Sequence, residues 1–571
     1  MEKRLLLAIV LSFLILLLFQ LVFVKKAPEL KPSVEPAGQA QNAVANRAPD
    51  KKPLEKDAHG LAPTAQNPSN ALKIKQLKSS EKTDITISTS LYEAVWSNKG
   101  GVLVSWKLRK HKNDKNQDLD LVPASASETG VYPFALLDDD PEAMKNGTKG
   151  IAENALNLPF YEVNGGEIRN SQKIRIMDGD KAEVRFAYAD ERGNEVEKKF
   201  VFYGGAYQFD ISLRIRKNGQ DVPPRLLWGP GIGNPTAAEL KQRMGTSGGA
   251  SFLISGKIFR LPEDVKKYKP EASGFNYVSW AAFDDVYFAA IFLPSGQNGT
   301  ASFLKQDTDK GSYFFLSMTS PQKAFIGPKE YDALADFGHD AKKIVQFGFF
   351  GFFAEILFYS IKFIHKFIPN WGFAIILLTI VIKIIFFPLT YSSTKSMAKM
   401  AGLQPKIKAL RNRYKKSKTD IEQRRQMNEE MMKLYKEHGV NPAGGCLPML
   451  IQIPFFFGFY GMLRAAIEFR QSPWILWIKD LSLHDPLYIT PILMGITQFI
   501  SQKMTPTSAD PSQQRMMLLM PLIFTVFFLS FSSGLVIYWL TSNVVQIGQQ
   551  YIMNRMIKAK KGESNGKRRK K

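Results

Sequence analysis

The sequence predicts a polytopic α-helical membrane protein, with six transmembrane helices and a large antiparallel β-sandwich domain outside the membrane. Three observations predict this class. Apolar runs long enough to cross a bilayer as helices occur at the N-terminus and repeatedly in the last third of the chain. Between them, short runs of alternating apolar and polar residues are separated by turn-forming residues, as in half-buried strands. The formal charge of +24 is gathered in blocks between the apolar runs, which is typical of membrane proteins.

Histidine and cysteine usage argues against a metalloenzyme. Cys446 is the only cysteine, so neither an internal disulfide framework nor a multi-cysteine metal site can form. The six histidines are scattered, and no two share a helix face at the spacing of metal ligands. Only His111 and His339 fall in the predicted β-sandwich domain, where no paired acid/base motif is visible. We therefore expect neither a bound metal nor enzyme activity.

Residues 1–24 are predicted to form an N-terminal transmembrane anchor. The apolar run Leu5–Val24 is preceded by Lys3-Arg4 and followed by Lys25-Lys26, with no small-residue cleavage site beside it. Signal peptides have a shorter apolar core, of about 7–15 residues. We expect an uncleaved anchor with a cytoplasmic N-terminus, the alternative being a cleaved signal. Residues 25–80, rich in Pro, Ala, Gln, Asn and Lys, are predicted to be a flexible tether.

Residues 81–340 are predicted to form the β-sandwich domain. Period-2 runs punctuated by Gly, Pro, Asn and Asp favour antiparallel strands. The clearest runs are Leu91–Trp96, Val102–Trp106, Lys199–Tyr203, Tyr207–Ile215, Tyr277–Phe283 and Tyr287–Leu293. Because this segment follows an anchor whose N-terminus is inside, the domain should lie outside the cytoplasmic membrane.

Residues 341–370 are predicted to form an amphipathic helix on the outer surface of the membrane. Glu355, Tyr359, Lys362 and Lys366 fall at three- and four-residue spacing along one face of an otherwise apolar segment. The next apolar run, residues 371–390, is the predicted second span. If both segments crossed the membrane, the basic loop that follows would lie outside, against the positive-inside rule. A spanning helix at 341–370 remains the alternative.

Residues 391–445 are predicted to form a cytoplasmic helical hairpin, because the loop carries 13 Lys and Arg against 5 Asp and Glu. An apolar seam marks the first helix, Thr419-Asp420-Ile421-Glu422 is typical of a capping box, and Gly439 of a C-terminal cap. Flexible, polarizable methionine suits surfaces that accept many apolar partners. We therefore expect the hairpin to contact apolar partner segments through Met400, Met427 and Met431.

Residues 446–553 contain four more apolar stretches, near 446–463, 488–503, 515–531 and 534–553. With the anchor and residues 371–390 they make six spans. Residues 554–571 form a basic tail that ends in Lys567-Arg568-Arg569-Lys570-Lys571. Six spans and a basic tail place both termini in the cytoplasm.

Lys383 is the most informative residue, because it lies inside the apolar run of the predicted second span. A lysine near the centre of a membrane helix costs about 2.5–3.5 kcal/mol on insertion scales. Together with Thr379 one turn away, it could face a hydrated concavity lined by polar residues of other spans: Gln452, Gln498, Tyr538, Asn543 and Gln546. The alternatives are a snorkelling lysine and ordinary hydrogen bonds between packed helices. No Asp or Glu lies inside a predicted span, which argues against an ion-coupled carrier.

Residues 340–555 resemble the YidC membrane protein insertases. The segments that carry the resemblance follow one another in order: Phe386-Phe387-Pro388-Leu389-Thr390, Leu403-Gln404-Pro405-Lys406-Ile407, Asn441-Pro442-Ala443-Gly444-Gly445-Cys446-Leu447-Pro448, Met520-Pro521-Leu522-Ile523-Phe524 and Ser533-Gly534-Leu535-Val536-Ile537-Tyr538-Trp539. The layout of anchor, tether, large outer domain and five-span core is similar to the Gram-negative branch of that family.

The resemblance implies a periplasmic β-supersandwich and a five-helix core with a hydrophilic groove, in the bacterial inner membrane. It implies a protein that inserts and folds membrane proteins, alone or with the Sec translocon, and needs no cofactor. The groove cation of the family is usually arginine, and the matching position here is Lys383. The expected partners are nascent membrane proteins, the Sec translocon, anionic lipids and the ribosome, the last through the basic tail and the hairpin. The alternative function is a solute carrier or channel with a periplasmic binding domain; the resemblance itself implies no small-molecule substrate.

Overall fold

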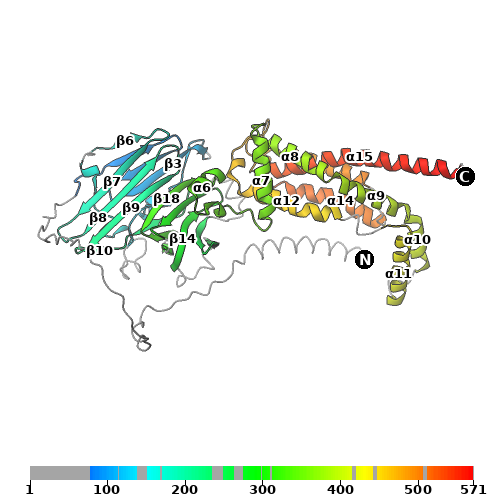
Figure 1. Ribbon diagram of the computed structural model, residues 1–571, viewed down its shortest axis with the longest axis horizontal. Coiled ribbons are helices and arrows are strands. Elements are labelled where there is room, and N and C mark those ends of the chain that lie inside the picture. The colour runs from blue at the N-terminus through cyan, green and yellow to red at the C-terminus, as the bar shows by residue number, and fades with distance from the viewer. Residues whose placement is uncertain are drawn as a thin grey trace, which may run out of the picture.

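The computed structural model describes residues 78–113, 115–137, 151–166, 170–234, 248–262, 274–296, 299–308, 311–414, 420–440, 447–505 and 511–569. The predicted anchor and almost all of the predicted tether lie outside these residues. The molecule is elongated, with a β-domain at one end, a helical bundle in the middle and a helical hairpin at the far end (Figure 1).

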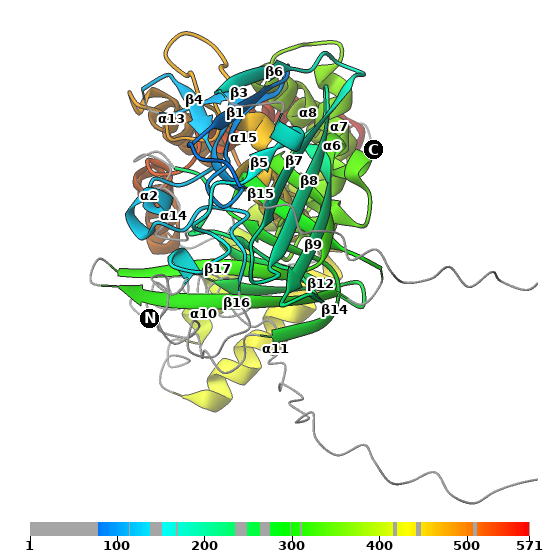
Figure 2. The same ribbon diagram turned by 90° about the vertical axis from the view of Figure 1, so that its left-hand side faces the viewer.

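The β-domain consists of two sheets. The smaller sheet has the order β4-β3-β2-β1-β6, built from β1 (Asp84–Ser88), β2 (Tyr92–Ser97), β3 (Val102–Lys112), β4 (Asp118–Asp120) and β6 (Gln172–Arg175). The main path of the larger sheet runs β11-β17-β16-β14-β15-β18-β9-β8-β7-β5, with β10 and β12–β13 at its sides. Figure 2 shows β7, β8 and β9 side by side.

The strands of the larger sheet are β5 (Glu162–Val163), β7 (Lys181–Ala189), β8 (Glu195–Tyr203), β9 (Gln208–Lys217), β10 (Gln220–Val222), β11 (Arg225–Trp228), β12 (Gly249–Ile254), β13 (Lys257–Pro262), β14 (Gly274–Asp284), β15 (Phe288–Pro294), β16 (Gly299–Thr308), β17 (Gly311–Thr319) and β18 (Pro321–Pro328). Short helical turns α2 (Ser125–Thr129) and η1 (Asn164–Gly166) lie in the connections. The large β-sheet domain predicted from period-2 runs is thereby confirmed.

Aromatic side chains from the two sheets meet in the core of the β-domain. The ring of Trp96 on β2 lies 4.4 Å from that of Phe200 on β8, and the ring of Trp106 on β3 lies 5.7 Å from that of Phe209 on β9, centroid to centroid. Large buried rings such as these contribute a large apolar area to the core between the sheets. The prediction of antiparallel pairing is wrong in one place, because β1 and β6 pair in parallel. A parallel pair needs a long connection, which the intervening strands provide.

The helical bundle contains α8 (Trp371–Ile385), α9 (Phe387–Gly402), α12 (Leu447–Ala465), α13 (Ile489–Met504), α14 (Pro511–Phe528) and α15 (Ser533–Arg569). Among the described residues, no single helix is both long and apolar enough to cross a membrane, whereas α8 and α9 meet that test as a bent pair. The helical core is established, and the number of spans stays a prediction.

The predicted second span is broken rather than continuous. Helix α8 ends at Ile385, and α9 starts at Phe387 at an angle of 57°. Pro388 stands in the first turn of α9, where its missing N–H costs nothing, but its ring disfavours continued helix through the preceding residue. At ~1.5 Å per residue, α8 alone is ~22 Å long, shorter than the ~30 Å hydrocarbon core.

Three short elements join the β-domain to the bundle: α6 (Tyr331–Phe337), η3 (Ala341–Ile344) and α7 (Gly351–His365). One face of α7 is buried, through Ala354, Leu357, Phe358 and Ile361. Two of its polar side chains, Glu355 and Lys362, contact α6. The Tyr331 hydroxyl donates to Glu355, and the Lys362 ammonium lies 2.6 Å from the Asp332 carboxylate. The apolar side chains of Phe352, Phe363 and Phe367 remain exposed along another face.

The hairpin consists of α10 (Gln404–Arg413) and α11 (Ile421–Glu437). The N-cap of α11 is Asp420, whose side chain accepts hydrogen bonds from the N–H groups of Glu422 and Gln423. The predicted capping box had Thr419 as its first residue, and Thr419 lies outside the described residues. Gly439 follows α11 with φ +58°, as a C-terminal glycine cap requires.

Candidate functional site

Helix α15 is the helix on which the predicted site residues converge. It packs against α8, α12 and α13, which carry Lys383, Gln452 and Gln498. Tyr538 and Asn543 lie on α15 itself. Polar side chains at helix–helix contacts in a membrane protein usually bond across the contact, since lipid offers them no partner. The hydrogen-bond partners of each predicted residue therefore show which helices it connects.

Lys383 lies in the last turn of α8, at the bend before α9. Its Nζ donates to Oε1 of Gln546 on α15 over 3.4 Å, and its backbone carbonyl accepts from Nε2 of Gln549 over 2.9 Å. The negative end of the α8 dipole also favours a cation at this place. Within the described part of the chain, no carboxylate forms an ion pair with Lys383, so its charge is met only by neutral groups.

Thr379 lies one turn before Lys383 and is buried. Its hydroxyl donates to the carbonyl oxygen of Ile375 over 2.7 Å, within its own helix. This bond uses its only donor, so Thr379 contributes an acceptor and a small side chain at the contact between helices.

Gln452 and Tyr538 form a pair between α12 and α15, since the Gln452 side chain lies in hydrogen-bond contact with the Tyr538 hydroxyl. The ring of Tyr538 stacks on that of Phe459, with centroids 4.3 Å apart. Tyr538 is buried, so both its ring and its hydroxyl are matched by partners on α12.

Gln498 and Asn543 connect α13 to α15. Oε1 of Gln498 accepts from the indole N–H of Trp539 over 3.1 Å. Nδ2 of Asn543 donates to the carbonyl of Met494 over 3.1 Å and to the Thr497 hydroxyl over 3.4 Å. These hydrogen bonds agree with the alternative that the polar residues only pack the helices together. Lys383 differs from them, because the side-chain partner of its positive charge is the neutral amide of Gln546.

Four further polar residues of α15 were missed by the sequence analysis: Trp539, Gln549, Gln550 and Asn554. Asn543, Gln546, Gln550 and Asn554 follow one another at three- and four-residue spacing. This spacing is the sequence signal that could have revealed Gln550 and Asn554. Gln549 and Gln550 are buried, and their Oε1 atoms have no hydrogen-bond partner among the described residues. A buried acceptor without a donor costs about 1–3 kcal/mol, so this face is more polar than packing alone requires.

The predicted client-contacting methionines are not all on the surface of the hairpin. Met400 is only 7% exposed and packs in a small cluster with Leu403 and Ile407, against which Met431 also lies. Met427 is half-buried. Met432 is the exposed methionine of α11, at 47%. A client could reach Met400 only if the hairpin opened.

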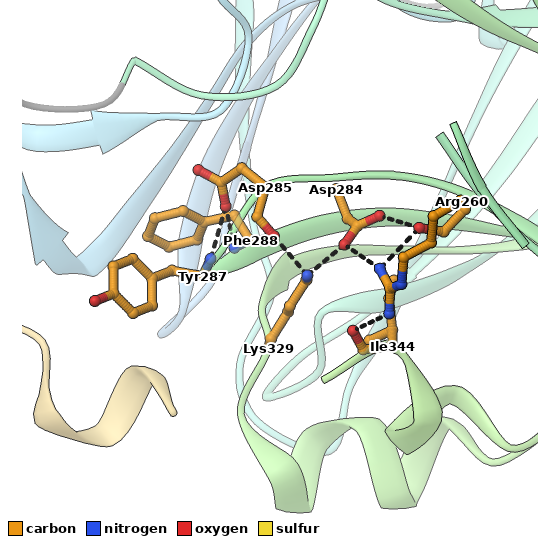
Figure 3. A network of polar contacts seen from close by, with 8 residues as sticks. Arg260, Asp284, Asp285, Tyr287, Phe288, Lys329 and Ile344 are labelled. Carbon is orange, nitrogen blue, oxygen red and sulfur yellow. Dashed lines mark hydrogen bonds and ion pairs between the residues drawn. The ribbon is translucent and has the colours of Figure 1, made fainter. Parts of the chain in front are cut away.

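A second polar cluster lies where the β-domain meets the helices (Figure 3). The Lys329 ammonium donates to the Asp284 carboxylate and to the carbonyl of Asp285. On the other side of Asp284, Arg260 lies 3.2 Å away and also donates to the Ile344 carbonyl over 2.7 Å. Burial lowers the pKa of Lys329, and the attraction of Asp284 opposes that shift. The cluster holds η3, and with it the entry to α7, on the end of the sheet.

Glu468 belongs to the loop between α12 and α13, in the turn η6 (Ile467–Phe469). Burial raises the pKa of Glu468 to about 7, with Lys362 opposing the shift and Glu330 adding to it. Its neighbour Ile467 is part of the hydrophobic core of the β-domain. This loop of the bundle therefore reaches the core of the β-domain through Ile467, and Glu468 lies beside α6 and α7.

Two family models match the chain. One, described as 60Kd inner membrane protein, matches residues 363–561, and the other, described as YidC periplasmic domain, matches residues 84–360. Together they cover both the helical bundle and the β-domain.

Curated relatives match almost the whole chain. The membrane protein insertase YidC of Syntrophus aciditrophicus (strain SB) is 36% identical over 586 residues, which covers 97% of this chain and 100% of the relative. The membrane protein insertase YidC of Citrifermentans bemidjiense is 35% identical, with coverages of 98% and 100%. A crystal structure of an active YidC insertase, with its first transmembrane domain resolved, is 20% identical, covers 84% of this chain and 95% of its own, and has a TM-score of 0.36.

Proposed function

This chain belongs to the YidC family of membrane protein insertases, and we propose that Lys383 is the charge that receives the polar flank of its clients. The protein is an inner membrane protein with a periplasmic domain, its substrates are nascent membrane proteins, and it is not an enzyme. The proposal concerns how the bundle performs that insertion.

The observation that supports the proposal is the neutral setting of the Lys383 ammonium. Its side-chain partner is the amide of Gln546, and the described residues offer it no carboxylate. A cation whose hydrogen bond goes to a neutral group keeps its full field, which is stronger in a medium of low dielectric than in water. An acidic side chain in a client's flank would therefore be attracted to this place.

We place the hydrophilic groove of the family along the faces of α8 and α15 that meet here. A hydrated groove shortens the apolar barrier that a polar flank must cross. The client's apolar helix would then enter lipid beside the bundle, driven by burial of its own surface at ~25 cal/mol per Å². A short flank then requires no external energy source.

The topology belongs to the same proposal. We place six spans at residues 1–24, α8 with α9, α12, α13, α14 and α15, with both termini in the cytoplasm. The basic hairpin and the basic tail support this orientation. Helix α7 is placed on the periplasmic surface, because its exposed phenylalanines suit the lipid interface while Glu355 and Lys362 contact α6. The proposed domain limits are those predicted from the sequence, so the second span ends at residue 390, within α9, and the tail starts at residue 554, within α15.

Further partners are also part of the proposal. The hairpin and the tail would contact the ribosome, because clustered Lys and Arg bind the phosphates of RNA. The same basic segments would attract anionic lipids at the cytoplasmic surface. We propose that the protein acts alone on short clients and beside the Sec translocon on longer ones.

Liposomes that contain only this protein test the proposal. Two ribosome-made clients are compared, identical except for an acidic or a neutral flank. Wild-type protein should insert both, and Lys383→Leu should reduce insertion of the acidic-flank client by about fivefold, the factor that corresponds to ~1 kcal/mol. Equal insertion of both clients by wild type and variant would show that Lys383 plays no part. Movement of a solute without insertion would favour a carrier.

A further inference from the structure

Both the side-chain ammonium and the backbone carbonyl of Lys383 form hydrogen bonds to α15. Helix α8 ends two residues after it, and the last carbonyl groups of a helix have no partner within that helix. Nε2 of Gln549 supplies a donor to the Lys383 carbonyl, 2.9 Å away. Gln549 therefore caps the bent end of α8 from the neighbouring helix.

The side chain of Lys383 is held from the same helix. Gln546 precedes Gln549 by three residues, so both amides lie on one face of α15. Oε1 of Gln546 accepts from Lys383 Nζ over 3.4 Å. A free lysine in a membrane helix extends its stem toward the nearest interface. The contact with Gln546 directs the stem sideways, toward α15.

We propose that Gln546 is a positioning residue, which keeps the Lys383 ammonium beside α15 at the bend without neutralising it. This inference rests on the proposed function of Lys383. A carboxylate at position 546 would hold the ammonium more tightly but would cancel its charge. An apolar residue would leave the charge intact but would let it move toward the interface. A neutral amide acceptor satisfies both requirements.

The bland alternative is that Gln546 and Gln549 only pack α8 against α15. That role predicts equal losses for all clients when Gln546 is changed, because a loosened bundle does not distinguish flank charges. The positioning role predicts a change in selectivity. The two roles are therefore separated by a ratio, which we call the flank ratio: insertion of the acidic-flank client divided by insertion of the same client with a neutral flank.

The experiment measures the flank ratio with the full-length protein in liposomes, at equal reconstituted amounts. Gln546→Glu should lower the ratio about fivefold, close to the value of Lys383→Leu, because the charge is cancelled within the protein. Gln546→Leu should lower it about twofold, because the charge is kept but displaced. Gln502→Glu adds the same charge to α13 and should leave the ratio at the wild-type value. The exchange Lys383→Gln with Gln546→Lys places the ammonium on the other side of the same contact and should restore the ratio.

The outcomes separate the inference from the function on which it rests. If Lys383→Leu does not change the flank ratio, the proposed function fails, and the positioning role fails with it. If Lys383→Leu lowers the ratio but Gln546→Glu and Gln546→Leu do not, only the positioning role is overturned. Equal losses for both clients in the Gln546 variants would also overturn it, because they would show a packing role. If the double variant Lys383→Gln with Gln546→Lys has the low flank ratio of Lys383→Leu, the positioning role is overturned as well.

Discussion

The Gln471 side chain pairs with the backbone of Lys112 as a neighbouring strand would. Its Oε1 accepts from the Lys112 N–H over 3.1 Å, and its Nε2 donates to the Lys112 carbonyl over 2.8 Å. Lys112 ends β3, whereas Gln471 lies in the loop between α12 and α13. Beside this pair, the guanidinium of Arg470 lies over the ring of Phe288, 5.4 Å from its centroid. The β-domain is therefore attached to the bundle through this loop as well as through the chain connection at α6.

Deleting residues 80–320 while keeping the remainder should preserve insertion but lower stability. All the proposed groove contacts lie within the bundle, so activity in liposomes should stay within about twofold of wild type. The deletion exposes Ile467, and loss of a buried large apolar contact costs about 2–5 kcal/mol, so the thermal midpoint should fall. Replacing Ile467 by Ser in the deletion protein should change the midpoint little. A stably inserted deletion protein without any activity would contradict this prediction.

Attachment of the β-domain should weaken as pH rises from about 4.5 to about 7, because burial raises the pKa of Glu468 to about 7 in the folded protein. The folded state then binds the proton more tightly than the unfolded state. The stabilisation that protonated Glu468 provides is complete below its pKa in the unfolded state. It is lost as pH rises through its pKa in the folded state. The charged groups that act on Glu468 are Glu330 and Lys362, and a backbone hydrogen bond from Tyr331 opposes the rise in its pKa. Thermal midpoints of full-length protein should therefore fall over this range.

Glu468→Gln is the control for that pH dependence. The amide cannot ionise, so the fall in thermal midpoint across this range should shrink, and the variant should be more stable than wild type above about pH 7. An unchanged pH profile in the variant would assign the dependence to another group.

Lys383→Arg should insert clients as well as wild type does, because positive charge is kept at the bend. Lys383→Glu should be worse than Lys383→Leu for the acidic-flank client, because attraction becomes repulsion, and the difference should be about threefold or more. The measurement is insertion in cells depleted of the wild-type protein, at equal variant levels. Identical insertion by the Glu and Leu variants would argue against a direct effect of charge.

A photo-crosslinker at Met432 should capture nascent apolar segments more efficiently than one at Met400. The Met432 side chain is exposed on α11, whereas Met400 is buried in the cluster with Leu403 and Ile407. From Met400 we expect mainly crosslinks within the hairpin. Client capture from Met400 equal to that from Met432 would show that the hairpin opens during insertion. Capture of lipid alone from both positions would remove the hairpin from the client path.

Removing residues 558–571 should weaken ribosome binding and flatten its dependence on salt. Helix α15 continues to Arg569, so its basic end is extended as a helix beyond the bundle (Figure 1). Each phosphate contact that is lost should reduce the slope of log K against log salt by about one. Binding is measured by sedimentation with empty ribosomes at several salt concentrations. An unchanged slope would leave the tail with a topological role only.

The parts of the fold that depend on local pattern were predictable. The run Tyr207–Ile215 overlaps β9 and Tyr277–Phe283 lies within β14, because alternation reports a strand directly. The break between α8 and α9 was not predicted, since the apolar pattern continues through Phe386. Backbone restriction at Pro388, and not hydrophobicity, sets that boundary.

The candidate site was predictable only in part for a similar reason. A lysine within an apolar run is conspicuous in sequence, whereas its partners Gln546 and Gln549 depend on α8 packing against α15. That pairing joins residues more than 160 positions apart, and no periodicity reports it. The insertion of Ile467 into the β-domain was missed because loop residues carry no repeating pattern.

The dependence of three helices on α15 bears on how the protein itself is made. Translation proceeds from the N-terminus, so α15 leaves the ribosome after α8, α12 and α13. Until it arrives, Lys383, Gln498 and Phe459 lack the partners that Gln546, Trp539 and Tyr538 provide. A chain that stops before Ser533 would carry these groups unmatched. The contacts that complete α8, α12 and α13 therefore form only after α15 has been synthesised and has joined them.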